Sequence, residues 1–371
     1  MYLVLFFVVL ALAYGNGAND NIKPFATVYG SRLLGYRQTL ALASGSQLAG
    51  SIVSIVVAGA LMKSFGGKGF VPDDLVGSVD FLVAVGIGAS VAVGLATRLG
   101  IPISTTHALV GGLAGSGLAI APNAVSWTAL AAVFFLPLVA SPAAAMILVA
   151  VLYPIITAIR RRFRVEPTTQ LVRAARYEFA TANSDGTADA RGAGYSYALR
   201  GGDSSGYEGT VLGLSAGRIV DTLHLGSAGA LGFARGLNDT PKILGILLAA
   251  KFAGGLNTHT ALAFVAVAMV IGGIMHSRKL ALTLSQKITS INRGQGLLAN
   301  AVSSLLVILA SFAGMPVSTT HVSSGAIFGL GLWTGEADWG VVRTILLAWF
   351  ATLPIAAVTA YAAFLLITFG Q

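Results

Sequence analysis

Long apolar segments follow one another along most of the chain, separated by short polar stretches. About 20 apolar residues span the hydrocarbon core of a bilayer as a helix, so segments of this length are predicted to be membrane-spanning helices. They cover residues 1–25, 38–62 and 81–96, about two spans within 127–159, then 219–250, 258–275 and 297–313, and about two spans within 339–369.

The composition points the same way. Of the 371 residues, 55% are hydrophobic and only 10% are charged, whereas a soluble domain has about 25% charged residues. A chain with so little polar surface predicts an all-α polytopic membrane protein. Cysteine is absent from the sequence, which excludes disulfides, thiolate metal sites and cysteine nucleophiles.

Two polar motifs interrupt the apolar pattern, and each occurs once in each half. Gly-x-Asn-Asp-x-x-Lys is found at 17–23 and 236–242, and Pro-x-Ser-Thr-Thr-His at 102–107 and 316–321. Duplicated polar inserts are typical of transporters built from inverted-topology repeats with broken helices, and both apolar segments that carry the first motif are expected to break at it. We therefore predict a first membrane repeat at 1–159, a hydrophilic linker at 160–217 and a second, inverted membrane repeat at 218–371.

The segments at 101–120 and 315–332 are apolar but rich in Gly, Ser and Thr. Each either spans the membrane or enters and returns as a re-entrant hairpin, which is permitted where the backbone is buried in protein. Counting both, the sequence predicts roughly 10–12 membrane segments.

Positive charges indicate the orientation, because cytoplasmic loops are enriched in Lys and Arg. Arg160, Arg161, Arg162 and Arg164 follow a predicted span and place the linker in the cytoplasm. Loop 63–80 is rich in acids and is expected outside, whereas its counterpart 278–295 carries only basic charges and is expected inside. Residues 1–22 and 344–371 lack Lys and Arg, so both termini are expected outside a cell (plasma or inner) membrane.

Asp20 and Asp239 lie deep within apolar segments. A carboxylate at bilayer depth is costly unless it is paired or binds a cation, so both are predicted to bind or couple a cation. Asn19 and Asn238 precede the aspartates, and an Asn-Asp pair beside Gly suits a broken helix. The carbonyls freed at such a break can ligate Na⁺, which is the candidate metal ion at Asp20 and Asp239. A helix cap or an interhelical hydrogen bond is the alternative, which duplication in both halves disfavours.

The two hydroxyl triplets each follow a proline. Hydroxyls and N–H groups at a helix start can cradle an anion, although a simple N-cap is the alternative for a single copy. His107 and His321 could accept a proton, hydrogen-bond an anion or merely pack, and His224 has no counterpart in the first half. The triplets are Ser104, Thr105 and Thr106, and Ser318, Thr319 and Thr320.

At these motifs the chain resembles the inorganic phosphate transporter (PiT) family, over both halves outside the linker. The resemblance implies a secondary active transporter of orthophosphate, in symport with Na⁺ or H⁺, that forms homodimers in the lipid bilayer and alternates access around a midplane site. By the same resemblance the two Asn-Asp pairs provide cation and phosphate ligands, and the Ser-Thr-Thr triplets hold the phosphate oxygens. No cofactor other than the coupling ion is implied.

Lys23 and Lys242 depart from the family pattern, which usually has Asn three places after the Asp. Each ammonium could take the place of a sodium ion, donate to phosphate or pair with its own aspartate. The departure puts at least one sodium site in doubt and favours H⁺ as the coupling ion.

Three other functions stay open. Sulfate or another tetrahedral oxyanion would fit the same cradle, but only protonated phosphate can donate to a carboxylate. A passive anion channel would need no coupling carboxylates. An intramembrane enzyme is disfavoured because the sequence carries no nucleophile or metal-binding motif, and without a Walker A motif uphill transport would be driven by an ion gradient.

Overall fold

The computed structural model describes residues 1–57, 59–72, 76–123, 125–167, 172–175, 195–198, 206–250, 257–281, 291–335 and 337–369. Its helices are α1 (Tyr2–Asp20), α2 (Ala26–Gly30), α3 (Tyr36–Val57), α4 (Gly59–Ser64), α5 (Val79–Leu99), α6 (Thr105–Ile120), α7 (Trp127–Leu130), α8 (Leu136–Arg162), α9 (Ala216–Ala249), α10 (Thr258–His276), α12 (Arg293–Phe312), α13 (Thr319–Thr334) and α14 (Trp339–Phe369), with a 3₁₀ turn at Lys23–Phe25 and a π-helical turn at Ala131–Phe135. The described part of the linker holds three antiparallel pairs: β1 (Glu166–Pro167) with β4 (Tyr207–Glu208), β2 (Val172–Ala175) with β3 (Tyr195–Ala198), and β5 (Thr210–Val211) with β6 (Leu214–Ser215).

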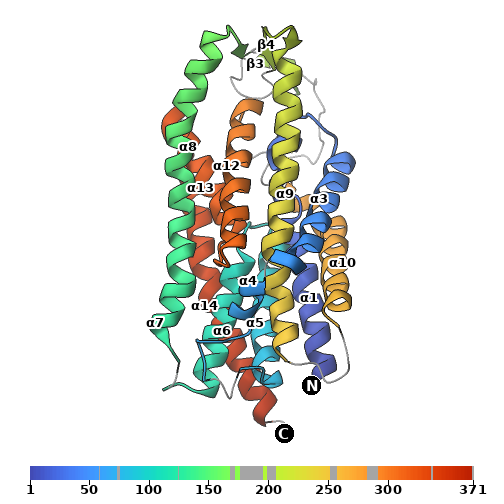
Figure 1. Cartoon of the computed structure of the whole chain (residues 1–371), viewed down its shortest axis with the longest axis vertical. Coiled ribbons are helices and arrows are strands. Elements are labelled where there is room, and N and C mark those ends of the chain that lie inside the picture. Colours follow the sequence, from blue (N-terminus) through green and yellow to red (C-terminus); the bar gives the residue numbers. More distant parts are fainter. Residues whose placement is uncertain are drawn as a thin grey trace, which may run out of the picture.

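The helices form an elongated bundle (Figure 1). Both chain termini lie at one end of it, and strand β4 lies at the other end, where α8 ends and α9 begins (Figure 1). Large apolar side chains remain exposed on the bundle, among them Val56 at 85% and Phe350 at 79%. Such a surface is suited to lipid rather than water.

Seven helical segments of the described chain are long and apolar enough to cross a membrane. They are Tyr2–Gly30, Tyr36–Val57, Val79–Leu99, Trp127–Arg162, Thr258–His276, Arg293–Phe312 and Trp339–Phe369. α9 has 34 residues and is also long enough, but its second half carries the charged residues Arg235, Asp239 and Lys242. The all-α fold predicted from the sequence is confirmed.

The prediction of two spans within 127–159 and two within 339–369 is wrong. Each region is one continuous helical segment, of 36 and 31 residues. Pro142, Pro154 and Pro354 lie inside these helices without ending them, as is common in membrane helices, where neighbouring groups satisfy the freed backbone. At 1.5 Å per residue each segment is roughly 45–55 Å long and exceeds the hydrocarbon core.

The predicted helix breaks are correct for only one motif copy. α1 ends at Asp20 and is followed by the 3₁₀ turn that contains Pro24. α9 instead continues through Pro241 to Ala249, so the break predicted there is wrong. A proline removes one backbone hydrogen bond, and the buried faces of α9 pack against α3 and α12, which stabilises the continuous helix.

The two hydroxyl motifs begin short helices in the middle of the bundle. α6 and α13 each have 16 residues, about 24 Å at 1.5 Å per residue, which is too short to cross the hydrocarbon core. Each follows an extended segment after a turn at a glycine with positive φ, Gly100 at 72° and Gly314 at 68°. Glycine adopts this conformation without steric cost.

The packing interleaves the two halves of the sequence. α1 packs on α10 and α9 on α3, while α14 covers α6 and α8 covers α13. The glycines of the first motif permit these contacts: a Cβ on Gly17 would lie 1.8 Å from Met269 O of α10, and one on Gly236 would lie 2.0 Å from Gln47 O of α3. Small residues allow membrane helices to approach this closely.

The equivalent loops lie at opposite ends of α9. Gly77, in the first loop, lies against the backbone of Ala249 at the end of α9. Arg293, in the second loop, pairs with Asp221 near its beginning, with Nη1 2.8 Å from Oδ2. This placement is what inversion requires, and the inverted-repeat organisation itself stays a prediction.

Candidate functional site

Two carboxylates approach each other inside the bundle, one from each half of the chain. Asp20 is the last residue of α1, Asp239 lies within α9, and both are buried. The Asn16 amide lies between them, with Nδ2 3.2 Å from Asp20 Oδ2 and 3.4 Å from Asp239 Oδ2. Two carboxylates buried this closely require cations beside them.

Lys23 supplies one of these cations. Its ammonium forms an ion pair with Asp20, three residues earlier. It also donates to the backbone carbonyl of Ile103 at 2.8 Å, just before the first hydroxyl triplet, and to Thr320 Oγ1 of the second triplet at 2.9 Å. One side chain thus joins α1 to the starts of both short helices.

Lys242 makes the corresponding contacts from the other half. Its ammonium lies 3.3 Å from Asp239 Oδ1, and it donates to the Val317 carbonyl at 2.5 Å and to Thr106 Oγ1 at 2.8 Å. Each lysine therefore binds its own aspartate, a carbonyl preceding its own half's hydroxyl triplet, and the last hydroxyl of the opposite triplet. The two triplets are held together by this crossed pattern.

Three of the four other triplet hydroxyls have protein partners. Thr105 Oγ1 donates to Asp20 Oδ2 at 3.3 Å. Ser104 and Ser318 are the N-caps of α6 and α13, and each accepts the backbone N–H three residues later at 3.2 Å. Capping leaves their hydroxyls engaged at the helix starts. The role of all six as phosphate ligands stays a prediction.

Asn19 and Asn238 hold the extended segments that precede the short helices. Asn19 donates to the Ile101 carbonyl at 3.1 Å and accepts from the Ile103 N–H at 3.3 Å. Asn238 donates to the Val317 carbonyl at 3.1 Å. In this structure their amides bind protein backbone, and their role as cation and phosphate ligands stays a prediction.

Arg235 belongs to the same cluster, although the sequence prediction does not include it. It is 1% exposed and donates to Asn16 Oδ1 at 2.5 Å and to Asn21 Oδ1 at 3.2 Å, while its Nε lies 3.7 Å from Asp239 Oδ2. The sequence could have identified Arg235, because it is a charged residue four positions before Asp239 in an apolar segment. Asn16 lies at the same distance before Asp20.

The charges in this buried cluster do not cancel. Among the residues that the structure describes there, Asp20 and Asp239 face Lys23, Lys242 and Arg235, which leaves one surplus positive charge. A buried surplus of positive charge favours an anion as the missing partner.

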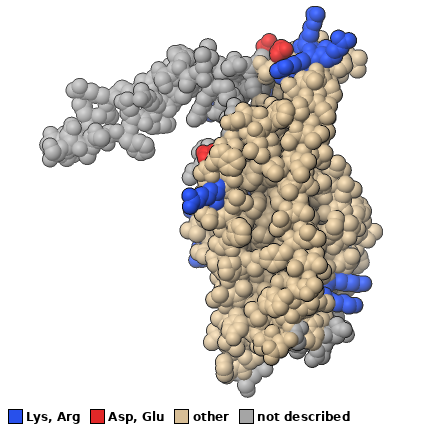
Figure 2. Space-filling model, turned by 90° about the vertical axis from the view of Figure 1, so that its left-hand side faces the viewer, with Lys and Arg blue, Asp and Glu red and all other residues tan. Residues whose placement is uncertain are grey.

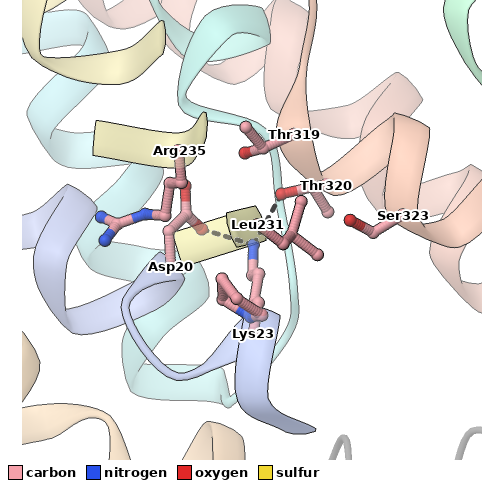
Figure 3. Close-up of a pocket in the computed structure, with 8 residues that line it drawn as sticks. Asp20, Lys23, Leu231, Arg235, Thr319, Thr320 and Ser323 are labelled. Atoms are coloured by element: carbon pink, nitrogen blue, oxygen red, sulfur yellow. Dashed lines mark hydrogen bonds and ion pairs between the residues drawn. The ribbon is translucent and has the colours of Figure 1, made fainter. Parts of the chain in front are cut away.

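A small pocket opens beside the cluster and contains both signs of charge. It is lined by Asp20, Lys23, Pro24, Leu231, Arg235, Thr319, Thr320 and Ser323. Figure 3 shows Lys23 between Asp20 and Thr320, with Ser323 and Thr319 presented from α13 across the pocket. Cationic groups and hydroxyls therefore converge on one space.

The two motif histidines contact each other, and one of them contacts a tryptophan of α14. The rings of His107 and His321 pack edge to face with centroids 4.3 Å apart, and His321 stacks on Trp349 at 3.6 Å. His224 lies elsewhere, with Nε2 2.9 Å from Thr27 Oγ1. The first two join α6, α13 and α14 by packing.

The fold and this cluster define a multi-pass membrane protein with a charged, hydroxyl-lined centre. The chain belongs to the phosphate transporter family, whose model matches residues 16–360. The family resemblance inferred from the motifs is thereby confirmed, and the chain is a transporter rather than an enzyme.

Individual relatives extend over nearly the whole chain. A protein of Mycobacterium bovis described as "Probable low-affinity inorganic phosphate transporter" is 28% identical, covering 96% of this chain and 75% of its own length. One of Bacillus subtilis with the same description is 27% identical, covering 96% and 95%. A solved structure titled "The sodium-dependent phosphate transporter" matches with a TM-score of 0.77 at 20% identity, covering 100% of this chain and 99% of that one, which shows a shared fold.

Proposed function

We propose that this protein carries inorganic phosphate across a cell membrane in symport with a cation, by alternating access around the cluster described above. Family membership supports phosphate as the substrate. The observation that carries the assignment to this site is its net positive charge beside threonine hydroxyls, buried between helices of both halves.

Arg235 is the contact best suited to the anion. Arg235 is one of the residues that line the pocket, and its buried Nε, 3.7 Å from Asp239 Oδ2, has no hydrogen-bond acceptor in the structure. Guanidinium groups bind phosphate oxygens with directed N–H donors. Thr319 and Ser323 line the opposite side of the same pocket and provide hydroxyls.

The carboxylates favour phosphate over sulfate. Phosphate carries a proton near neutral pH and can donate a hydrogen bond to Asp20 in the pocket, whereas sulfate has no such donor. A site with one surplus positive charge is neutralised by the monoanion, or by the dianion together with one proton.

The crossed lysine contacts supply a mechanism for coupling. If α6 and α13 moved relative to α1 and α9, the Lys23–Thr320 and Lys242–Thr106 hydrogen bonds would have to break and be replaced by others. Substrate bound among these groups would therefore bias which arrangement is stable. Secondary transporters built from repeats bind their substrates at the repeat interface, and a site formed by both halves would match that position.

The orientation is proposed from charge. Arg160, Arg161 and Arg162 form the last turn of α8, at the linker end of the bundle, where Figure 2 shows basic side chains gathered. The positive-inside rule places this end in the cytoplasm and the two termini outside. We also propose a homodimer in the bilayer, as the family resemblance implies.

Uptake of labelled phosphate into proteoliposomes tests the function. Inward proton and sodium gradients are imposed separately, with a hundredfold excess of sulfate as competitor and empty liposomes as control. Concentrative uptake that sulfate does not suppress supports phosphate symport. Uptake that only equilibrates indicates a passive channel, and full competition by sulfate identifies an oxyanion permease instead.

A further inference from the structure

We propose that the ammonium groups of Lys23 and Lys242 are built-in cations that occupy two alkali-cation positions, so that phosphate passes through this site without sodium. This inference rests on the proposed function for its transport assay. It also makes a separate prediction about sodium binding that does not depend on the substrate.

The atoms around each ammonium are those that a hard cation would take. Lys23 Nζ is surrounded by a carboxylate of Asp20, the carbonyl of Ile103 and the hydroxyl of Thr320. Carboxylate, carbonyl and hydroxyl oxygens beside a broken helix are the usual ligands of sodium in membrane transporters. Here three oxygens of these types surround a nitrogen.

The second ammonium repeats the arrangement with the same atom types. Lys242 Nζ is surrounded by a carboxylate of Asp239, the carbonyl of Val317 and the hydroxyl of Thr106. The three ligands come from equivalent motif positions in the two halves, and the hydroxyl crosses over in both cases. A lysine that only paired with its own aspartate would not require two further matched ligands.

The N–H donors of each lysine and their acceptors distinguish a built-in cation from a phosphate ligand. An ammonium has three N–H donors and no acceptor. Lys242 donates hydrogen bonds to three protein oxygens, and Lys23 donates to two and forms an ion pair with Asp20, so protein oxygens surround both ammonium groups. Arg235 differs, because its Nε is buried without an acceptor and the residue lines the pocket.

Because both ammonium groups are buried, they exclude sodium from these positions by their size and by their charge. Lys242 is 1% exposed and the Lys23 side chain 11% exposed, so neither ammonium can withdraw into water while the structure stays closed. A sodium ion at the same oxygens would meet a like charge in the same space. Sodium is therefore excluded from both positions as long as the lysines are present.

Purified wild-type protein and four single variants test this proposal. Lys23→Asn and Lys242→Asn shorten the side chain and leave space and ligands for an ion, whereas Lys23→Met and Lys242→Met remove the charge but fill the space. Thermal unfolding is measured in NaCl and in KCl at equal concentration and pH, with no phosphate present. Phosphate uptake under a fixed proton gradient is measured in the same two salts.

The proposal predicts no difference between the salts for wild type. The Asn variants should melt several degrees higher in NaCl than in KCl. Their phosphate uptake should be at least tenfold faster in NaCl than in KCl. The Met variants should lose uptake in both salts. A sodium-specific rise in the melting temperature of the Asn variants would support built-in cations even if no sample took up phosphate. Failure of uptake in every sample would count against the proposed function alone.

Three outcomes would overturn the proposal. Sodium could raise the wild-type melting temperature or uptake, the Asn variants could transport normally in KCl, or they could lose function without any sodium effect on uptake or melting. If an Asn variant does not fold in either salt, the wild-type comparison between the salts still decides, since any sodium requirement there contradicts built-in cations.

Discussion

The Lys23 ammonium donates to the Thr320 hydroxyl at 2.9 Å, across a sequence separation of 297 residues. The reciprocal contact, between Lys242 and Thr106, measures 2.8 Å. These two hydrogen bonds fasten the hydroxyl triplet of each half to the charged motif of the other. Both halves therefore build one central cluster. Substitutions of its residues in either half are expected to impair transport to a similar degree.

Removing either crossed hydroxyl should therefore impair transport to a similar degree. Thr106→Val and Thr320→Val preserve shape but remove the acceptor for a lysine. Hydrogen bonds to charged groups contribute about 1.5–3 kcal/mol, which corresponds to roughly 10- to 100-fold in uptake rate. Thr344→Val serves as the control, because its exposed hydroxyl bonds only to Gly340 O within α14. Unequal effects of the two site variants would contradict the crossed arrangement.

Arg235 should determine phosphate affinity. Arg235→Gln removes the surplus positive charge and the Nε donor that has no hydrogen-bond acceptor, so the KM for phosphate should rise at least tenfold. Arg235→Lys should restore part of the affinity through charge alone. Arg293→Gln is the matched control, since Arg293 pairs with Asp221 away from the cluster. A KM within twofold of wild type in Arg235→Gln would exclude Arg235 from anion binding.

The motif glycines should be required for folding rather than chemistry. Gly17→Ala and Gly236→Ala would force a Cβ to within 1.8 Å and 2.0 Å of facing carbonyl oxygens. Overpacking of this kind costs about 1–3 kcal/mol and should lower the melting temperature. At Gly229 of α9 a Cβ meets nothing within 4 Å, so Gly229→Ala should be neutral or stabilising by up to about 1 kcal/mol. Equal melting temperatures for all three would refute the close-packing account.

Tyr207 anchors the described end of the linker to α12. Its hydroxyl donates to Asn292 Oδ1 at 3.0 Å, and Arg160 lies over its ring at 5.7 Å. Burial raises the pKa of the phenol above its ordinary value of 10.0. Because the folded-state pKa is raised, the stabilisation is fully present below pH 10 and is lost as the pH rises through the folded-state pKa.

The Tyr207→Phe variant tests this anchor. It should lose about 1 kcal/mol of stability at neutral pH and show a weaker decline in melting temperature above pH 10. Thermal scans of wild type and variant between pH 7 and pH 11 check both effects. A variant that matches wild type over this range would show that the contact does not stabilise the fold.

Much of the architecture was predictable because hydropathy and motif spacing are local properties of the sequence. Asp20, Asp239, Lys23 and Lys242 stand out as charges within apolar segments, and all four meet in the cluster. The exchange of hydroxyls between halves was not predictable, since it depends on how α6 and α13 approach each other. Arg235 carried a signal of the same kind as the aspartates.

The number of spans predicted within 127–159 and 339–369 was wrong for a different physical reason. A long apolar run between 127 and 159 fits two short helices or one long helix by length alone, and hydropathy does not distinguish them. Prolines were poor guides for the same reason, because Pro24 follows a helix end whereas Pro241 lies inside a continuous helix. Tertiary packing, rather than local preference, decides which proline ends a helix in this environment.

The most direct test of the shared site is labelled-phosphate uptake by Asp20→Asn and Asp239→Asn proteins, reconstituted in equal amounts beside wild type under an inward proton gradient. If one cluster built by both halves couples and carries phosphate, each single variant should lose concentrative uptake. Concentrative uptake at the wild-type rate by either variant would contradict the account.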